Sequence, residues 1–532
     1  MTQRFQARWH APAFVVAHAA LTILSHPDAA LSFLGWVSLV PILLLVHSVD
    51  DWRRAARLSW VAGSLAYFGT IVWLCTVGQY SGMGPTWGWI AGVFGALVLS
   101  SYMGLYVALF AGLTAALLRP SGWRYGLGVA VLWTFCEWLR SWVITGFPWA
   151  ALGYTQWNNL LVAQLSRLGG VALVTFVLAV GNAAIARTVW GTRATDRRDL
   201  WYARAPATVV LVATVAYGLW ALGRDLPEGT TVRVAVVPGN VPQSERWQRD
   251  SLATNLRRYI ESLEPAAERE PDLIVMPETA IPYPYLTPAD SALFVDVAKR
   301  LEVPILFGAP RIVSDPRTGG RVSLNSVMVL RTDGSFGDPY DKQHLVPFGE
   351  YIPFRRYMPD FLEGVIGIGD QLAGDGVVLL PVQAGGATVL AGVPICFESV
   401  FPEIARDFAR SGANLIVVIT NDGWYDETAA IAQHNAFSVF RAIETGRTLV
   451  RAANRGISCV IDANGRTRES TVGPMDRDGI IVEDVPLRAG STLYVRFGDW
   501  VSVLCVAVTG AMLLGRVYRR RRTHAVDDER TE

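Results

Sequence analysis

Hydrophobic residues dominate the first 222 positions, in stretches long enough to cross a membrane. A membrane-spanning helix needs ~20 largely apolar residues. The pattern predicts spans near 11–25, 29–47, 58–78, 88–118, 123–142, 161–186 and 206–222, and one more near 498–515. The first stretch is short, but no small-residue cleavage site follows it, so we interpret it as an uncleaved anchor.

Arginines gather in every second loop between these spans. They follow the second, fourth and sixth spans, whereas the loops containing HPD, QYSGMGPTW and VITGFPWAALGYTQWNN carry no Lys or Arg. The positive-inside rule therefore predicts a cytoplasmic N-terminus. With eight spans the basic tail RVYRRRR at 516–522 is also cytoplasmic, and residues 223–497 lie on the external face, which in a bacterium is the periplasm.

From residue 231 the pattern changes to short runs rich in Val and Ile, bounded by turn residues, such as TVRVAVVP, PDLIVMPE, VPILFGAP, ATVLAGVPIC and ANLIVVIT. Such runs are typical of strands. Amphipathic helical stretches intervene at about 248–264, 289–301, 402–411 and 429–446. We expect a seven-span bundle at 1–222, a layered α/β domain at 223–495, and the last span with its basic tail at 496–532.

The composition agrees with a membrane protein. The chain is 51% hydrophobic and 17% charged, with a mean hydropathy of +0.29, which is too apolar for an ordinary soluble enzyme of 532 residues. The net charge of +1 gives no reason to expect nucleic-acid binding, because a protein that binds the nucleic-acid backbone needs a basic face. Glu137 and Arg140 lie on one face of the fifth span. An intramembrane charge is a functional hint, but a neutralised pair that fixes helix packing explains them equally well.

Two residues directly follow predicted strands, where ligands of α/β sheets collect. They are Glu278, after LIVMP, and Cys396, after VLAGVPI. The α/β domain holds one further cysteine, Cys459. Three interpretations of Cys396 therefore remain open: a nucleophile, a small core residue, or the partner of Cys459 in a disulfide. No Cys or His pair has the spacing of metal ligands.

A cysteine nucleophile requires a base, because a thiol pKa of ~8.5 leaves little thiolate at neutral pH. The carboxylate of Glu278 could serve as that base, although a strand-end carboxylate can also cap a helix.

Only two of the 47 basic residues are lysines. Lys299 lies on a polar helix face, whereas Lys342 lies in the loop YDKQHLVPFGEYIP. A lysine offers a compact charge that guanidinium cannot replace, so Lys342 is a third candidate.

Glu, Lys and Cys in this chain order, on strand-end loops, resemble the nitrilase superfamily. Five motifs, GNVPQSERW (239–247), MPETAIP (276–282), YDKQHLVPFGEYIPF (340–354), GVPICFES (392–399) and NDGWY (421–425), resemble its membrane branch, the apolipoprotein N-acyltransferases. WLRSWVITGFPWAALGYTQ at 138–156 and the eight spans extend the resemblance over essentially the whole chain. It implies a multi-pass α-helical membrane bundle that carries an external nitrilase-like α/β domain, an αββα sandwich.

The resemblance also implies roles for individual residues. Cys396 would be the nucleophile, Glu278 the general base and Lys342 the stabiliser of the oxyanion. Four residues would support the site or bind substrate: Trp247, Glu350, Phe397 and Glu398. The family usually has tyrosine directly after the nucleophile, so Phe397 keeps the ring and loses a hydroxyl that could form hydrogen bonds.

The implied reaction moves a fatty acyl chain from a phospholipid to the N-terminal amine of diacylglyceryl-cysteine in apolipoproteins, through a Cys thioester. We expect no cofactor or metal, and a monomer in the bacterial inner membrane with both termini in the cytoplasm. The apolar, aromatic segment 351–369 is expected to be a mobile lid, or alternatively an ordinary packed loop. Two other classes are a membrane-tethered amidase that releases its acyl group to water, and a transporter, for which the spans offer few ionisable groups.

Overall fold

The computed structural model describes residues 2–80, 83–118, 122–191, 197–224, 229–246, 248–316, 319–353, 355, 371–470 and 479–531. The chain divides into two compact units. The first comprises Met1–Val72, Phe94–Leu222 and Asp499–Glu532, and the second comprises Trp73–Val93 and Gly223–Gly498. The second unit therefore includes a short segment from the hydrophobic half of the sequence.

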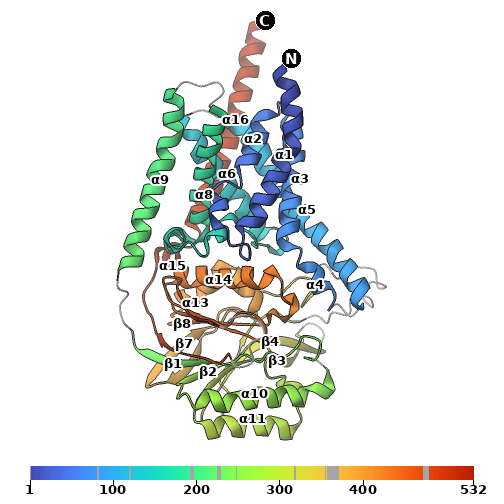
Figure 1. Cartoon of the computed structure of the whole chain (residues 1–532), viewed down its shortest axis with the longest axis vertical. Coiled ribbons are helices and arrows are strands. Elements are labelled where there is room, and N and C mark those ends of the chain that lie inside the picture. The colour runs from blue at the N-terminus through green and yellow to red at the C-terminus, as the bar shows by residue number, and fades with distance from the viewer. Residues whose placement is uncertain are drawn as a thin grey trace. The chain divides into compact units, whose positions relative to one another are not determined.

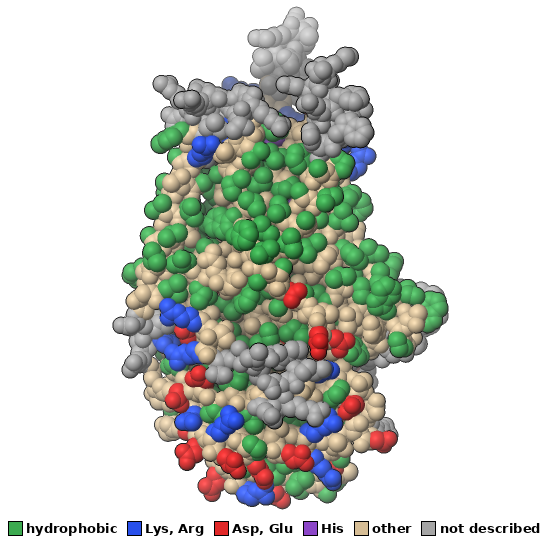
Figure 2. All heavy atoms as spheres, viewed as in Figure 1, with side chains coloured by type: hydrophobic (Ala, Val, Ile, Leu, Met, Phe, Trp, Pro, Cys, Tyr) green, Lys and Arg blue, Asp and Glu red, His purple; other side chains and the backbone are tan. Residues whose placement is uncertain are grey.

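The first unit is helical (Figure 1). Its long helices are α1 (Thr2–Ser25), α3 (Trp52–Ile71), α6 (Gly122–Trp142), α8 (Ser166–Gly191), α9 (Arg197–Gly223) and α16 (Trp500–Thr531), and α2 (Val40–Ser48) is shorter. Helix α5 (Pro85–Leu117) belongs to this unit from Phe94 onward, and its first part belongs to the second unit. Figure 2 shows hydrophobic side chains over most of the visible face of this unit, whereas Lys, Arg, Asp and Glu gather on the second unit. An exposed surface made mostly of hydrophobic side chains indicates that this unit is embedded in a membrane.

Five helices in the described part of the chain are long and apolar enough to cross a membrane. They are Pro85–Leu117, Gly122–Thr145, Ser166–Trp190, Arg204–Gly223 and Trp500–Arg522. The apolar helices Ala11–Ser25 and Ser32–Ser48 are shorter than a full span. The structure thus supports a membrane part with five such helices, and the count of eight spans stays a prediction.

Glu137 and Arg140, the charged pair of α6, fasten the loop that follows this helix. Glu137 accepts a hydrogen bond from the backbone N–H of Leu152 at 2.8 Å. Arg140 donates to the carbonyls of Phe147 and Trp149, each at 2.6 Å. Both charges therefore satisfy backbone groups within the unit, which favours the packing interpretation.

The second unit is an αββα sandwich with two six-stranded sheets in its described residues. One sheet has the order β12-β1-β2-β3-β4-β5, formed by β1 (Thr231–Val236), β2 (Leu273–Val275), β3 (Ile305–Ser314), β4 (Arg321–Leu330), β5 (Tyr340–Asp341) and β12 (Ile481–Pro486). The other has the order β11-β10-β9-β8-β7-β6, formed by β6 (Leu380–Ala384), β7 (Ala387–Gly392), β8 (Leu415–Thr420), β9 (Leu449–Ala453), β10 (Cys459–Ile461) and β11 (Thr467–Ser470).

Helices cover the outer face of each sheet (Figure 1). The first sheet packs against α10 (Leu252–Ala267) and α11 (Pro288–Leu301), and the second against α13 (Pro402–Arg410) and α14 (Ala429–Thr445). Strand β8, LIVVIT, is buried at every position. A strand covered on both faces is expected to be continuously hydrophobic. The hydrophobic composition of β8 therefore follows from its burial on both faces of the sheet.

The parallel strands bring their carboxyl ends to common edges. Strands β1, β2 and β3 run parallel in one sheet, and β7, β8 and β9 run parallel in the other. The loops that leave these carboxyl ends therefore lie close together. Ligands of α/β sheets bind at this edge.

Candidate active site

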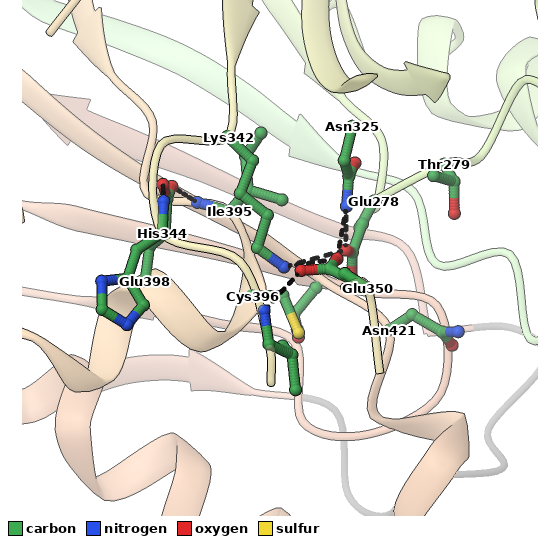
Figure 3. A network of polar contacts seen from close by, with 12 residues as sticks. Glu278, Thr279, Asn325, Lys342, His344, Glu350, Ile395, Cys396, Glu398 and Asn421 are labelled. Atoms are coloured by element: carbon green, nitrogen blue, oxygen red, sulfur yellow. Dashed lines mark hydrogen bonds and ion pairs between the residues drawn. The ribbon is translucent and has the colours of Figure 1, made fainter. Parts of the chain in front are cut away.

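The three residues predicted to carry the chemistry come from loops of both sheets. Glu278 follows β2, Lys342 directly follows β5, and Cys396 begins the 3-10 turn η7 (Cys396–Val400) after β7. Figure 3 shows the side chains of Lys342, Glu278 and Glu350 converging, with the Cys396 sulfur beside them. The sandwich therefore gathers residues from a stretch of more than a hundred positions, from Glu278 to Cys396.

Lys342 is a buried ammonium held by two carboxylates. Its side chain is 1% exposed, and its Nζ lies 2.8 Å from Glu350 Oε1 and 3.9 Å from Glu278 Oε1. Burial lowers the pKa of Lys342, but Glu350 and then Glu278 raise it more, so the net shift is upward. A positive charge thus stays fixed in a site that excludes water, where it acts more strongly than in solvent.

Glu278 is oriented by a residue that the sequence pattern did not reveal. Asn325 of β4 donates through Nδ2 to Glu278 Oε1 at 2.7 Å and to Glu350 Oε1 at 3.2 Å. The other oxygen of Glu350 accepts from the backbone N–H of Val346 at 2.8 Å. Both carboxylates are therefore held in place, and an uncharged side chain in the middle of a strand gave no signal of this role.

The backbone around Glu278 is tightly packed. A Cβ added to Gly308 of β3 would come within 2.7 Å of the Cα of Glu278 and 2.4 Å of the backbone nitrogen of Thr279. Thr279 itself has a φ of 45°. Arg246 donates to the carbonyl of Glu278 and to the hydroxyl of Thr279. The turn that presents Glu278 is therefore shaped by a close approach that requires glycine on the neighbouring strand.

Cys396 is 8% exposed and has a φ of 52°. A non-glycine residue with this left-handed backbone is uncommon and persists only when its surroundings hold it. Burial, and then Glu278, raise the pKa of the Cys396 thiol, whereas Lys342 lowers it, and the net shift is upward. The resting sulfur therefore carries its proton.

The two cysteines of the α/β domain do not form a disulfide. All five cysteines are free, and the thiol of Cys459 donates to Asn435 Oδ1 at 3.4 Å. The interpretation of Cys396 as half of a disulfide is therefore wrong.

Glu398 joins the cysteine turn to the lysine loop. Its buried carboxylate accepts from the backbone N–H groups of Ile395 at 2.7 Å, Gln343 at 2.7 Å and His344 at 3.1 Å. It also accepts from the Tyr340 hydroxyl at 3.0 Å. Burial raises the pKa of Glu398 to about 7, although the backbone donors oppose the shift. Glu398 therefore connects the loop carrying Lys342 to the turn carrying Cys396 through hydrogen bonds to the backbone of both.

The remaining predicted residues are partly described. Phe397 is buried, and its ring packs edge-on against Phe401 with 5.2 Å between centroids. Trp247 lies outside the described residues, and so does segment 351–369 apart from 351–353 and 355. No group of three His, Cys, Asp or Glu side chains in the described ranges could hold a metal ion.

A segment from the hydrophobic half of the sequence also contacts this neighbourhood. Trp73 packs edge-on against Tyr425 of η8 (Asp422–Tyr425), with 5.0 Å between centroids. The Tyr80 hydroxyl donates to Asp426 Oδ1 at 2.7 Å. Burial, and then the nearby Cys396, raise the pKa of Tyr425 well above its usual value. Trp73 and Tyr80 therefore brace a loop that adjoins the cysteine, and sequence reasoning missed both.

The fold and the Glu-Lys-Cys cluster define a class of protein. Residues 233–491 match the family model described as carbon-nitrogen hydrolase, and residues 18–184 match the apolipoprotein N-acyltransferase N-terminal domain. This chain therefore combines a carbon-nitrogen hydrolase domain with a part made of apolar helices.

Curated relatives match nearly the full length. The chain is 34% identical to the apolipoprotein N-acyltransferase of Geobacter metallireducens, covering 96% of this chain and 95% of that protein. It is 32% identical to that of Gloeobacter violaceus, covering 93% and 92%, and 33% identical to that of Bordetella bronchiseptica, covering 97% and 98%. The chain belongs to the apolipoprotein N-acyltransferase family, as the sequence motifs predicted, and it is a bacterial membrane enzyme.

Proposed function

We propose that this chain transfers a fatty acyl chain from a membrane phospholipid to the N-terminal amine of the diacylglyceryl-cysteine of apolipoproteins, through a thioester on Cys396. The names of its relatives support the acceptor and the reaction class. The observation that carries the mechanism is the buried ammonium of Lys342, 3.9 Å from Glu278 Oε1, beside the thiol of Cys396. Such a cluster suits acyl transfer by a covalent nucleophile.

In the first step the Cys396 sulfur attacks the ester carbonyl of the phospholipid. Glu278 accepts the thiol proton as the carbon–sulfur bond forms, because the raised thiol pKa leaves no standing thiolate. The Lys342 ammonium faces the negative charge on the carbonyl oxygen, and one such donor is worth ~3 to 4 kcal/mol. The carbon–oxygen bond then breaks, and the lysophospholipid leaves with the proton from Glu278.

In the second step the free amine of the acceptor attacks the thioester. An α-amino group has a pKa of ~7.7 to 8.0, so a useful fraction is neutral at pH 7. Glu278 accepts the proton that the nitrogen loses, the carbon–sulfur bond breaks, and the proton returns to the Cys396 sulfur. The enzyme is regenerated, and the amide product leaves.

The setting we propose is the bacterial inner membrane, with eight spans, both termini in the cytoplasm and the catalytic domain in the periplasm. The arrangement of loop arginines supports this orientation. Its organisation would be a bundle at 1–222, a catalytic domain at 223–495 and a last span with its tail at 496–532. We propose a monomer in which one chain supplies all of the predicted catalytic residues. Anchoring confines the search for two lipid substrates to a plane.

Intact-mass measurement of the purified enzyme after incubation with phospholipid tests this function. We expect an acyl-sized adduct on Cys396 that passes to the amine of a diacylglyceryl peptide. Cys396→Ala should form no adduct, and Cys459→Ala should form it normally. Equal loss in both variants would contradict the assignment, and prompt release of free fatty acid without peptide acylation would indicate the amidase alternative.

A further inference from the structure

A network of buried polar groups lies behind Cys396. The Nδ1 atom of His434 is 2.8 Å from Asp422 Oδ1, and Arg451 donates to Asp422 Oδ2 at 2.8 Å. On the other side of the ring, His434 Nε2 is 3.2 Å from the carbonyl oxygen of Cys396 and 3.0 Å from Ser399 Oγ. Asp422, His434, Arg451 and Ser399 are each 0% exposed. The mechanism above uses none of these four side chains.

The hydrogen bonds give the ring a defined direction. The Ser399 hydroxyl donates to the Cys396 carbonyl at 2.8 Å, and the Ser399 oxygen lies 3.0 Å from His434 Nε2. Although burial raises the pKa of Asp422, Arg451 and then His434 lower it to about 2, which keeps it a carboxylate that accepts from the ring. Asp422 therefore orients His434 so that Nε2 faces the backbone of the cysteine turn.

Asp422 is connected to Cys396 by a second route. The Thr420 hydroxyl is 3.0 Å from Asp422 Oδ1 and also hydrogen-bonds to the Cys396 thiol. The same carboxylate thus reaches the sulfur through Thr420 and the carbonyl through His434. Because Cys396 has a φ of 52°, its backbone relaxes unless such contacts hold it. A rotation there would turn the sulfur away from Glu278 and Lys342.

We propose that His434, oriented by Asp422, is a positioning residue that holds Cys396 in its left-handed conformation and directs the sulfur at the reacting carbonyl. The inference rests on the proposed role of Cys396 as nucleophile. His434 touches neither substrate in this account. Its loss therefore slows both acyl transfers and leaves the binding of phospholipid unchanged.

Substitutions in the full-length enzyme test the proposal. His434→Leu removes both polar contacts, and we expect the maximal rate of thioester formation to fall about 100-fold, as for a small misplacement of a reacting group. The KM for phospholipid should change less than about twofold, because His434 makes none of the contacts that bind the substrate before it reacts. His434→Gln keeps a hydrogen-bonding amide group near the position of Nε2 and should recover at least about tenfold of the lost rate, by the same geometric argument.

A second readout follows the sulfur itself. Alkylation of Cys396 by N-ethylmaleimide, measured by peptide mass spectrometry over a pH series, should slow in His434→Leu and recover in His434→Gln. Asn435→Ala is the matched control, because it removes another buried contact of α14, the one to Cys459. It should lower the Tm without changing the alkylation of Cys396. If His434→Leu does not accumulate, Ser399→Ala removes one donor to the same carbonyl and should lower the maximal rate in the same way.

The outcomes separate this inference from the proposed function. An active Cys396→Ala enzyme would overturn the proposed function itself. An inactive Cys396→Ala enzyme together with a normal maximal rate in His434→Leu would overturn the positioning role alone. Equal loss of rate in His434→Leu and Asn435→Ala, without rescue by glutamine, would also overturn it.

Discussion

The amide nitrogen of Asn325 lies 2.7 Å from Oε1 of Glu278, and both side chains are buried. This contact orients the carboxylate that we assign as the base. A hydrogen bond to a charged group contributes ~1.5 to 3 kcal/mol. Asn325→Leu should therefore lower the rate of thioester formation about 10- to 100-fold. Asn325→Asp should cost more, because it adds a third carboxylate beside Glu278 and Glu350. A lower Tm with an unchanged rate in single-turnover measurements would contradict this role.

Lys342→Arg should severely slow thioester formation although it keeps the charge. The ammonium fits between two carboxylates as a point charge, and a planar guanidinium cannot occupy the same position. We expect a loss of about 100- to 1,000-fold, the range for removal of one oxyanion donor. Lys299→Arg is the control, since Lys299 is the other lysine and is exposed. Single-turnover mass spectrometry measures both, and full activity of Lys342→Arg would rule out the oxyanion role.

Gly308→Ala should impair catalysis through the backbone. The new Cβ would lie 2.4 Å from the backbone nitrogen of Thr279, which forces the turn carrying Glu278 to shift. A displacement of about 1 Å at a reacting group can cost about 100-fold in rate. The matched control is Gly337→Ala, whose added Cβ would come no nearer than 3.4 Å to another atom. Equal steady-state rates for the two variants would show that the turn tolerates the shift.

His344 should make the stability of the enzyme depend on pH. Burial, and then Lys342, lower its pKa from 6.5 to about 4. The folded state thus binds this proton more weakly than the unfolded chain does, so the contribution of neutral His344 is complete above pH 6.5 and is lost as the pH falls toward 4.

The comparison of two unfolding curves isolates this contribution. Between pH 6.5 and pH 4 the free energy of unfolding of the wild type should fall by about 2 kcal/mol more than that of His344→Gln, after allowance for partial exposure. Denaturant titration in detergent at a series of pH values measures the difference. Parallel pH dependences of the two proteins would show that His344 is not the group responsible.

Tyr80→Phe should weaken the brace on the loop beside the cysteine. The variant loses the 2.7 Å hydrogen bond to Asp426 Oδ1 and keeps the ring that contacts Trp424. A hydrogen bond to a charged group is worth ~1.5 to 3 kcal/mol, so we expect faster hydrogen exchange at residues 424–426 and a several-fold slower acyl transfer. Tyr518→Phe, at an exposed position of α16, is the control. Unchanged exchange at 424–426 would mean that Tyr80 does not hold this loop.

The sequence determined the elements and the kinds of side chain that carry the chemistry. Continuous apolar stretches indicated membrane helices, and the strand-end positions of Glu278 and Cys396 and the rarity of lysine singled out three residues that the structure places together. These signals are visible because hydrophobic periodicity and unusual residue types are local properties of the chain.

Only the tertiary structure decided which partners hold those residues. Asn325 and His434 are polar side chains inside a strand and a helix, and Trp73 comes from the hydrophobic half of the sequence. The sequence left Cys459 as a potential disulfide partner of Cys396, whereas in the structure its thiol donates a hydrogen bond to Asn435. Such contacts depend on how two sheets and their helices stack, so residues hundreds of positions apart become neighbours for reasons that no local pattern contains.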